Sequence, residues 1–200
     1  LRQKIVSIAR LMNASGLNQG TSGNLSVRIS GGMLITPSSV PYEQMEPSDL
    51  IPLGFDGSPL EATFSKDSET YLRPSSEWRF HADILASRPE IQAVLHCHSA
   101  NATALACHRK GVPPFHYMTA VAGGPDIRCA PYATFGTPEL SKNALQALEG
   151  RVACLLEKHG LISLGLNLDE ALRVAIEVEM LAEIYLKSCQ IGEPSLLSEK

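Results

Sequence analysis

Two histidines one residue apart are the side chains in this sequence best placed to do chemistry. His96 and His98 lie in Val94-Leu-His-Cys-His-Ser99, at the end of an apolar run. In a strand, side chains alternate between faces, so both imidazoles would point the same way, about 7 Å apart along the strand. Neutral imidazole binds Zn²⁺ and similar divalent cations. The pair therefore predicts convergence on one metal ion, although two ordinary strand-end histidines would give the same pattern.

A third histidine and a carboxylate extend this interpretation. His159 occupies the turn Glu157-Lys-His-Gly160 between two apolar runs, so we expect it at a sheet end. Three protein ligands and an open position are typical of catalytic zinc, whereas structural zinc normally has a fourth permanent ligand. Glu77 follows Ser75-Ser76 at the start of a predicted helix, where the helix dipole favours a carboxylate. Near a metal, Glu77 could instead act as general base or as a displaceable fourth ligand.

Three small turns rich in hydroxyl groups are candidates for holding an anion. They are Gly20-Thr-Ser-Gly-Asn24, Thr36-Pro-Ser-Ser39 and Pro74-Ser-Ser76. None contains Lys or Arg, but such turns can hold phosphate with backbone N–H groups, hydroxyls and a helix N-terminus. Each alone also has the composition of an ordinary turn. The sequence contains neither a Walker loop nor a Rossmann fingerprint, so these phosphate-binding motifs are excluded.

The elements that must position these residues follow from apolar periodicity and turn residues. A loop is expected around 61–73, and hairpins mix with helices without a regular βαβ alternation. We therefore predict an α/β fold, a single-domain sandwich over 1–200 with a mostly antiparallel central β-sheet flanked by helices. Helices are expected over 1–14, 75–87, 99–108, 138–148 and 167–187, and strands over 25–29, 33–36, 91–98, 115–120, 152–156 and 161–164.

Composition and charge exclude several classes of protein. The 200 residues are 44% hydrophobic and 19% charged, which is too apolar for a disordered chain. Lys and Arg number 17 against 21 Asp and Glu, a net charge of −4, whereas nucleic-acid binders normally carry a basic surplus. The chain has no apolar run of membrane-spanning length and no signal-peptide pattern at its start. Five scattered cysteines without a C-x-x-C pair fit reduced thiols, so we expect a cytoplasmic protein with no nucleic-acid or membrane partner.

Seven segments form a joint pattern that is more specific than any one of them. In chain order they are Gly16–Arg28 (GLNQGTSGNLSVR), Leu34–Tyr42 (LITPSSVPY), Pro74–His81 (PSSEWRFH), His96-Cys-His98, His116-Tyr-Met118, Ala130–Thr137 (APYATFGT) and Lys158-His-Gly160. This pattern resembles the class II, zinc-dependent sugar-phosphate aldolases, and the resemblance runs from about residue 1 to 190.

The resemblance implies a role for each matching residue. His96, His98 and His159 match the metal ligands, and Glu77 matches the catalytic acid/base that also ligates the free metal. The phosphate-binding positions are matched by Thr21, Asn24, Ser38, Ser39, Ser75 and Ser76, with Gly23 in the same turn.

The resemblance also concerns the aldehyde side of the site and the assembly. Tyr117 matches a tyrosine that a neighbouring subunit supplies to protonate the aldehyde oxygen, and Phe135 matches a wall residue near the aldehyde. Family members are typically cyclic tetramers with active sites at subunit interfaces, so a homotetramer is expected. Two segments depart from the pattern of one family member. The segment 61–73 is longer here, and the chain ends soon after Leu197, where that member continues into a tail with another functional tyrosine. The aldehyde is therefore left open.

The implied activity is metal-dependent, reversible retro-aldol cleavage of a ketose 1-phosphate to dihydroxyacetone phosphate and an aldehyde. The sugar would be L-fuculose 1-phosphate or a related 5-deoxy- or 5-methylthioribulose 1-phosphate, and the cofactor Zn²⁺, with Mn²⁺ or another divalent metal as alternatives. Ribulose-5-phosphate 4-epimerase and methylthioribulose-1-phosphate dehydratase, on the same fold, stay open. Epimerases carry Asp after the paired serines, where this chain has Glu77. Non-catalytic adducin-head modules lack the histidine set that is present here.

Overall fold

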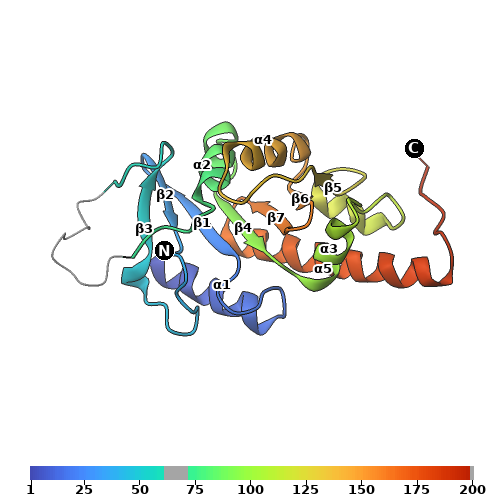
Figure 1. Ribbon diagram of the computed structural model, residues 1–200, viewed down its shortest axis with the longest axis horizontal. Coiled ribbons are helices and arrows are strands. Elements are labelled where there is room, and N and C mark those ends of the chain that lie inside the picture. The colour runs from blue at the N-terminus through green and yellow to red at the C-terminus, as the bar shows by residue number, and fades with distance from the viewer. Residues whose placement is uncertain (61–71, 199–200) are drawn as a thin grey trace.

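A seven-stranded β-sheet forms the middle layer of the computed structural model, which describes residues 1–60 and 72–198 (Figure 1). The strand order is β3-β2-β1-β4-β7-β6-β5. Strands β5 and β6 pair in parallel, and the other neighbouring strands pair antiparallel. The predicted α/β fold with a mostly antiparallel sheet is confirmed. The strands are β1 (Asn24–Ile29), β2 (Gly32–Ile35), β3 (Ile51–Gly54), β4 (Ala93–Cys97), β5 (Arg128–Ala130), β6 (Ala153–Leu156) and β7 (Gly160–Gly165).

Helices cover both faces of this sheet (Figure 1). α2 (Trp78–Ser87) and α4 (Pro138–Ala147) pack on one face, and α1 (Arg2–Ala14), α3 (Ala100–Cys107) and α5 (Leu168–Ile191) pack on the other. Each face has its own apolar core, and β4 contributes to both, because Leu95 belongs to one core and Val94 to the other. Burial on both faces explains why β4 and β6 are almost continuously apolar in sequence. No helix of the described residues is long and apolar enough to cross a membrane.

One predicted strand is wrong. The segment expected to be a strand over 115–120 instead contains the 3₁₀ helix η2 (Tyr117–Ala122), preceded by His116, whose side chain accepts a hydrogen bond from the Met118 N–H. Phe115, Met118 and Val121 pack against the core. This spacing of three residues suits the three-residue turn of a 3₁₀ helix rather than the alternation of a strand.

Two further differences concern short or terminal segments. The sequence pattern does not predict β3 and β5. β3 contains Pro52, and proline is normally a signal against a central strand, but β3 lies at the edge of the sheet. β5 has only three residues, which is too short for a clear pattern. α5 continues to Ile191, beyond its expected end at 187, and Gly192 follows it. The loop expected around 61–73 lies outside the described residues over 61–71.

Candidate active site

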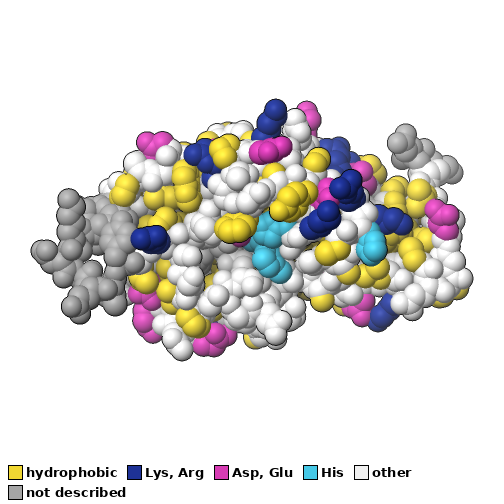
Figure 2. All heavy atoms as spheres, viewed as in Figure 1, with side chains coloured by type: hydrophobic (Ala, Val, Ile, Leu, Met, Phe, Trp, Pro, Cys, Tyr) yellow, Lys and Arg dark blue, Asp and Glu magenta, His cyan; other side chains and the backbone are white. Residues whose placement is uncertain are grey.

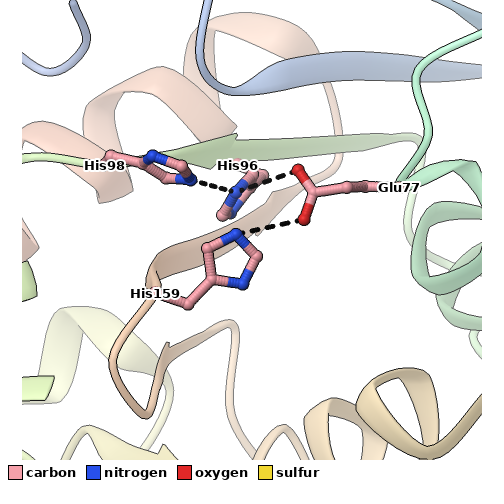
Figure 3. Close-up of side chains that lie close together, drawn as sticks. All are labelled: Glu77, His96, His98 and His159. Carbon is pink, nitrogen blue, oxygen red and sulfur yellow. Dashed lines mark hydrogen bonds and ion pairs between the residues drawn. The ribbon is translucent and has the colours of Figure 1, made fainter. Parts of the chain in front are cut away.

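Four side chains from three separate segments converge where β4 ends and β7 begins (Figure 3). His96 lies in β4, His98 directly follows that strand, and His159 lies in the turn before β7. Glu77 is the residue that precedes α2, and its side chain points toward the three imidazoles instead of capping its own helix. One ligand atom from each of the four lies within 4.8 Å of the others. The sheet thus assembles one cluster from positions that are far apart in the sequence.

The tautomer of His96 follows from its hydrogen bonds. Nδ1 of His96 lies 2.9 Å from the carbonyl oxygen of Leu161. Because a carbonyl oxygen only accepts, Nδ1 carries the proton and Nε2 is left with a bare lone pair. That lone pair faces Nε2 of His98 at 3.0 Å and Oε2 of Glu77 at 3.3 Å. A ring N–H held by a backbone carbonyl, with the other nitrogen free, is the usual orientation of a metal-binding histidine.

Glu77 is a buried carboxylate with one oxygen only partly satisfied. Its Oε2 accepts a hydrogen bond of 2.9 Å from Nδ2 of Asn24. Its Oε1 lies 3.1 Å from Nε2 of His159 but has no well-formed hydrogen bond among the described residues. Burial opposes ionisation of Glu77, but His96 and His159 outweigh it and hold the pKa of the carboxyl well below its usual range. Burial, aided by the neighbouring imidazoles of His96 and His159, lowers the pKa of His98 to about 4.

These observations together test whether a divalent metal suits the cluster. The set offers imidazole nitrogens, one with its lone pair already aimed inward, and an ionised carboxylate whose Oε1 has no well-formed hydrogen bond within the described part of the chain. Nitrogen and carboxylate donors of this kind suit Zn²⁺ and related ions. The residues present therefore fit a divalent metal.

Two glycines allow the close approach on which this geometry depends. A Cβ at Gly160 would lie 2.4 Å from the carbonyl oxygen of Cys97 and 2.9 Å from Cδ2 of His98. Gly23 has φ +80°, and a Cβ there would lie 2.6 Å from the carbonyl oxygen of His96. Any other residue would push the hydroxyl-rich turn or the start of β7 away from the histidines, because such contacts are closer than real Cβ atoms allow.

A cleft of about 400 Å³ opens beside the cluster. Figure 2 shows a group of histidine side chains reaching the surface near the middle of the visible face. Asn18 supports one wall of this cleft. Its Nδ2 donates a hydrogen bond to the Ser22 carbonyl, and its Oδ1 accepts one from the His98 N–H. The cleft is lined by all seven residues predicted to bind phosphate, namely Thr21, Gly23, Asn24, Ser38, Ser39, Ser75 and Ser76.

The structure brings most of the predicted site residues together, but not all. Phe135 lines the same cleft as Glu77, His98 and His159. Tyr117 does not, because its side chain is 72% exposed and lines a separate cleft with His116 and Leu197. Within one chain, Tyr117 therefore does not reach the carboxylate and histidine cluster.

Sequence reasoning missed two residues at this site. Lys158 lines the cleft, and its ammonium lies 3.5 Å from Glu157 and over the ring of Tyr132. Its place directly before His159 was the available signal. His81 is buried and bonds Asn24; its signals were its place at the end of the Pro74–His81 segment and its position one helical turn after Glu77.

Comparisons with known proteins agree with this geometry. A sequence model of the class II aldolase and adducin N-terminal domain matches residues 3–186. A 5-methylthioribulose-1-phosphate/5-deoxyribulose-1-phosphate aldolase of Rhodospirillum rubrum is 49% identical over 197 residues, covering 98% of this chain and 85% of that protein. An L-fuculose phosphate aldolase of Escherichia coli K12 is 46% identical over 194 residues, covering 97% and 86%.

A solved structure shows the same fold. The chain matches a structure of L-fuculose 1-phosphate aldolase with a TM-score of 0.91 and 38% identity, over 99% of this chain and 90% of that one. The family match spans nearly the whole chain, and the similar proteins are aldolases. The chain therefore belongs to the class II aldolase and adducin N-terminal domain family and is a class II aldolase.

Proposed function

We propose that this chain catalyses reversible, metal-dependent cleavage of a ketose 1-phosphate to dihydroxyacetone phosphate and an aldehyde. The observation that carries the proposal is the position of Glu77, which lies between the histidine cluster and a cleft walled by hydroxyl-rich turns. The similar proteins are named as aldolases of L-fuculose phosphate or of 5-deoxy- and 5-methylthioribulose 1-phosphate, which supports this substrate class. We take residues 1–200 as one such catalytic domain.

The metal would be held by His96, His98 and His159, with Glu77 as a displaceable fourth ligand. We propose Zn²⁺, with Mn²⁺ or another divalent cation as alternatives, because imidazole and carboxylate donors suit these ions. When bound, the cation supplies Lewis acidity that stabilises negative charge as the carbon–carbon bond breaks.

Glu77 would act as the acid and base. In condensation, the Glu77 carboxylate would remove a proton from the hydroxyl-bearing carbon of dihydroxyacetone phosphate, and that carbon would bond to the aldehyde carbon, whose oxygen takes a proton from Tyr117 of a neighbouring copy. In cleavage both protons would move back: the substrate hydroxyl gives its proton to Tyr117 as the carbon–carbon bond breaks, and protonated Glu77 returns its proton to the carbon. Its two oxygens suit this task, because Oε2 is held by Asn24 while Oε1 is free of a well-formed hydrogen bond. The carboxylate is thus anchored on one side and available on the other.

The phosphate would be held by neutral groups. Thr21, Asn24, Ser38, Ser39, Ser75 and Ser76 supply hydroxyl, amide and backbone N–H donors, and α2 points its N-terminus toward the same cleft. Helix N-termini and backbone N–H groups bind anions without a basic residue. Holding the phosphate away from the reacting carbon fixes the orientation of the sugar, and that binding energy can serve catalysis.

We further propose a homotetramer in which Tyr117 enters the cleft of a neighbouring copy, while Phe135 contacts the aldehyde. Tyr117 is exposed and lines a separate cleft instead of the one beside Glu77, which supports this arrangement. A cytoplasmic location is proposed because all five cysteines are free thiols, as expected in a reducing compartment.

A substrate panel tests the activity. The zinc-loaded protein is given L-fuculose 1-phosphate, 5-deoxyribulose 1-phosphate and 5-methylthioribulose 1-phosphate, and release of dihydroxyacetone phosphate is measured. At least one sugar should release it, and the Glu77→Gln variant should not. Epimerisation of a pentulose 5-phosphate, or loss of water without carbon–carbon cleavage, in place of that release would overturn the proposal.

A further inference from the structure

His81 is a fully buried histidine that none of the roles above uses. It lies in α2 with no exposed surface, and its ring stacks on Phe80 with the centroids 4.7 Å apart. Nδ1 of His81 lies 2.7 Å from Oγ of Ser26, and Nε2 lies 2.5 Å from Oδ1 of Asn24. Both partners come from β1, so the ring bridges that strand and α2. Buried polar groups of this kind are costly unless every one is satisfied.

The direction of every hydrogen bond in this group can be worked out. Nδ2 of Asn24 donates to the Glu77 carboxylate, which only accepts, so Oδ1 of Asn24 faces His81. Oδ1 only accepts as well, so His81 carries its proton on Nε2. Nδ1 is then an acceptor and takes the Ser26 hydroxyl proton. The donors run one way, from Ser26 through His81 and Asn24 to Glu77.

The surroundings favour this single state of the ring. Burial, with the neighbouring imidazole of His96, lowers the pKa of His81 to about 3 against the opposing effect of Glu77. In the part of the chain that the structure describes, His96 and Glu77 are the titratable groups that shift its pKa. The ring is therefore neutral, and a neutral ring that donates from Nε2 to Oδ1 of Asn24 must accept at Nδ1.

We propose that His81 is a positioning residue, which fixes the orientation of the Asn24 amide so that its NH₂ group holds the Glu77 carboxylate. The two ends of an amide have nearly the same shape, so packing alone does not choose between them. Rotated by half a turn, Asn24 would present its oxygen to an anionic oxygen and would repel it. The same rotation would set the Asn24 NH₂ group against the Nε2–H of His81, so the hydrogen bonds at both ends of the amide oppose it. This inference rests on the proposed role of Glu77.

Two substitutions separate positioning from simple packing. His81→Gln keeps an N–H donor near the place of Nε2, whereas His81→Leu removes it. Loss of a residue that orients a metal ligand typically costs about 10–100-fold in affinity or activity. We expect His81→Leu to lower kcat and the affinity for Zn²⁺ alone by about that factor, and His81→Gln to recover most of both. Equal loss in the two variants, or no loss in either, would contradict the inference.

A hydroxyl pair gives a matched control. Ser26→Ala removes the first donor of the chain and should lower kcat by a few-fold. Ser163→Ala also removes a buried strand hydroxyl, one that bonds the Ala171 carbonyl, and should leave kcat unchanged. An equal loss of kcat in Ser26→Ala and Ser163→Ala would mean that the loss comes from packing and not from the donor chain.

The tautomer can be measured without turnover or folding-sensitive variants. Long-range ¹⁵N NMR of the wild-type protein should show His81 as the Nε2–H tautomer, with no titration between pH 5 and 8. An Nδ1–H tautomer or a titrating ring would overturn the inference even if the protein is an active aldolase. Conversely, unchanged turnover in Glu77→Gln would remove the proposed role of Glu77 while leaving the tautomer as found.

Discussion

Asn24 and His96 face each other across the antiparallel pair of β1 and β4. One pair of hydrogen-bonded strands therefore fixes both Asn24, which holds the Glu77 carboxylate, and His96, whose Nε2 lone pair faces that carboxylate. Strand β7 continues this arrangement, because His96 pairs with Ile162 and the Leu161 carbonyl holds the His96 ring. The hydroxyl-rich turn and the histidine cluster are thus parts of one rigid sheet end, which leads to the following predictions.

The histidine cluster should bind about one divalent ion per chain. His159→Ala removes one of three nitrogen ligands and should lower the affinity for Zn²⁺ by at least tenfold, because the remaining donors cannot complete the coordination. Metal analysis and titration with Zn²⁺ measure this. His108→Ala, at the exposed end of α3, is the control and should bind as the wild type does; an equal loss there would point to an unspecific effect.

Glu77→Gln should keep the metal but lose turnover by about 10²–10⁴-fold, the range expected for a general acid or base. The amide has the same shape but cannot exchange the proton. Steady-state kinetics and metal content are measured together. Glu139→Gln, in the exposed first turn of α4, should have no effect, and an unchanged kcat in Glu77→Gln would exclude the proposed role.

Inorganic phosphate should compete with the sugar phosphate for the hydroxyl-rich cleft. Ser76→Ala removes one donor, and a hydrogen bond to a charged group contributes about 1.5–3 kcal/mol, so the inhibition constant for phosphate should rise about tenfold or more. Inhibition kinetics with phosphate test this. Ser87→Ala, whose hydroxyl bonds the Ile84 carbonyl at the far end of α2, should leave the constant unchanged. Non-competitive inhibition would place the phosphate elsewhere.

Gly160→Ala should destabilise the fold by about 1–3 kcal/mol, as overpacking typically does, and should weaken metal binding. Its Cβ would clash with the Cys97 carbonyl beside His98. Gly150→Ala is the control. Gly150 has φ +65°, so the substitution strains the backbone, but no described atom lies within 4 Å of the new Cβ and no steric clash results. Denaturant unfolding and zinc titration measure both variants. Only Gly160→Ala should affect the metal; a matching loss in Gly150→Ala would disprove the steric account.

Stability should fall as the pH falls from about 6.5 toward about 3, in part because of His81. Its pKa is about 3 in the folded protein and about 6.5 in an unfolded chain. Between these values the unfolded chain binds a proton that the folded protein does not, so acid favours unfolding, by at most about 1.4 kcal/mol per pH unit. His81→Gln removes this proton uptake. The unfolding free energy measured against pH should therefore be less steep in His81→Gln, and identical slopes would contradict the assignment.

Much of this molecule is encoded locally and could be predicted from the sequence. Alternating side chains at His96 and His98, and apolar repeats in the helices, depend only on backbone geometry and burial. The segment 115–120 shows where such reasoning fails. Its composition suits a strand, but its apolar residues are three apart, and a 3₁₀ helix packs them against the core. The short edge strands β3 and β5 form because neighbouring strands offer hydrogen-bond partners, which no local pattern reveals.

The sequence by itself determined which residue types were available: three histidines, Glu77 and three hydroxyl-rich turns, in an order specific to one family. Only the tertiary structure decided how they meet. The strand register places Asn24 beside His96, the Leu161 carbonyl selects the His96 tautomer, and β1 supplies both partners of His81. Hydrogen-bond direction depends on which donor faces which acceptor across the sheet, and that pairing exists only once distant segments of the chain are packed together.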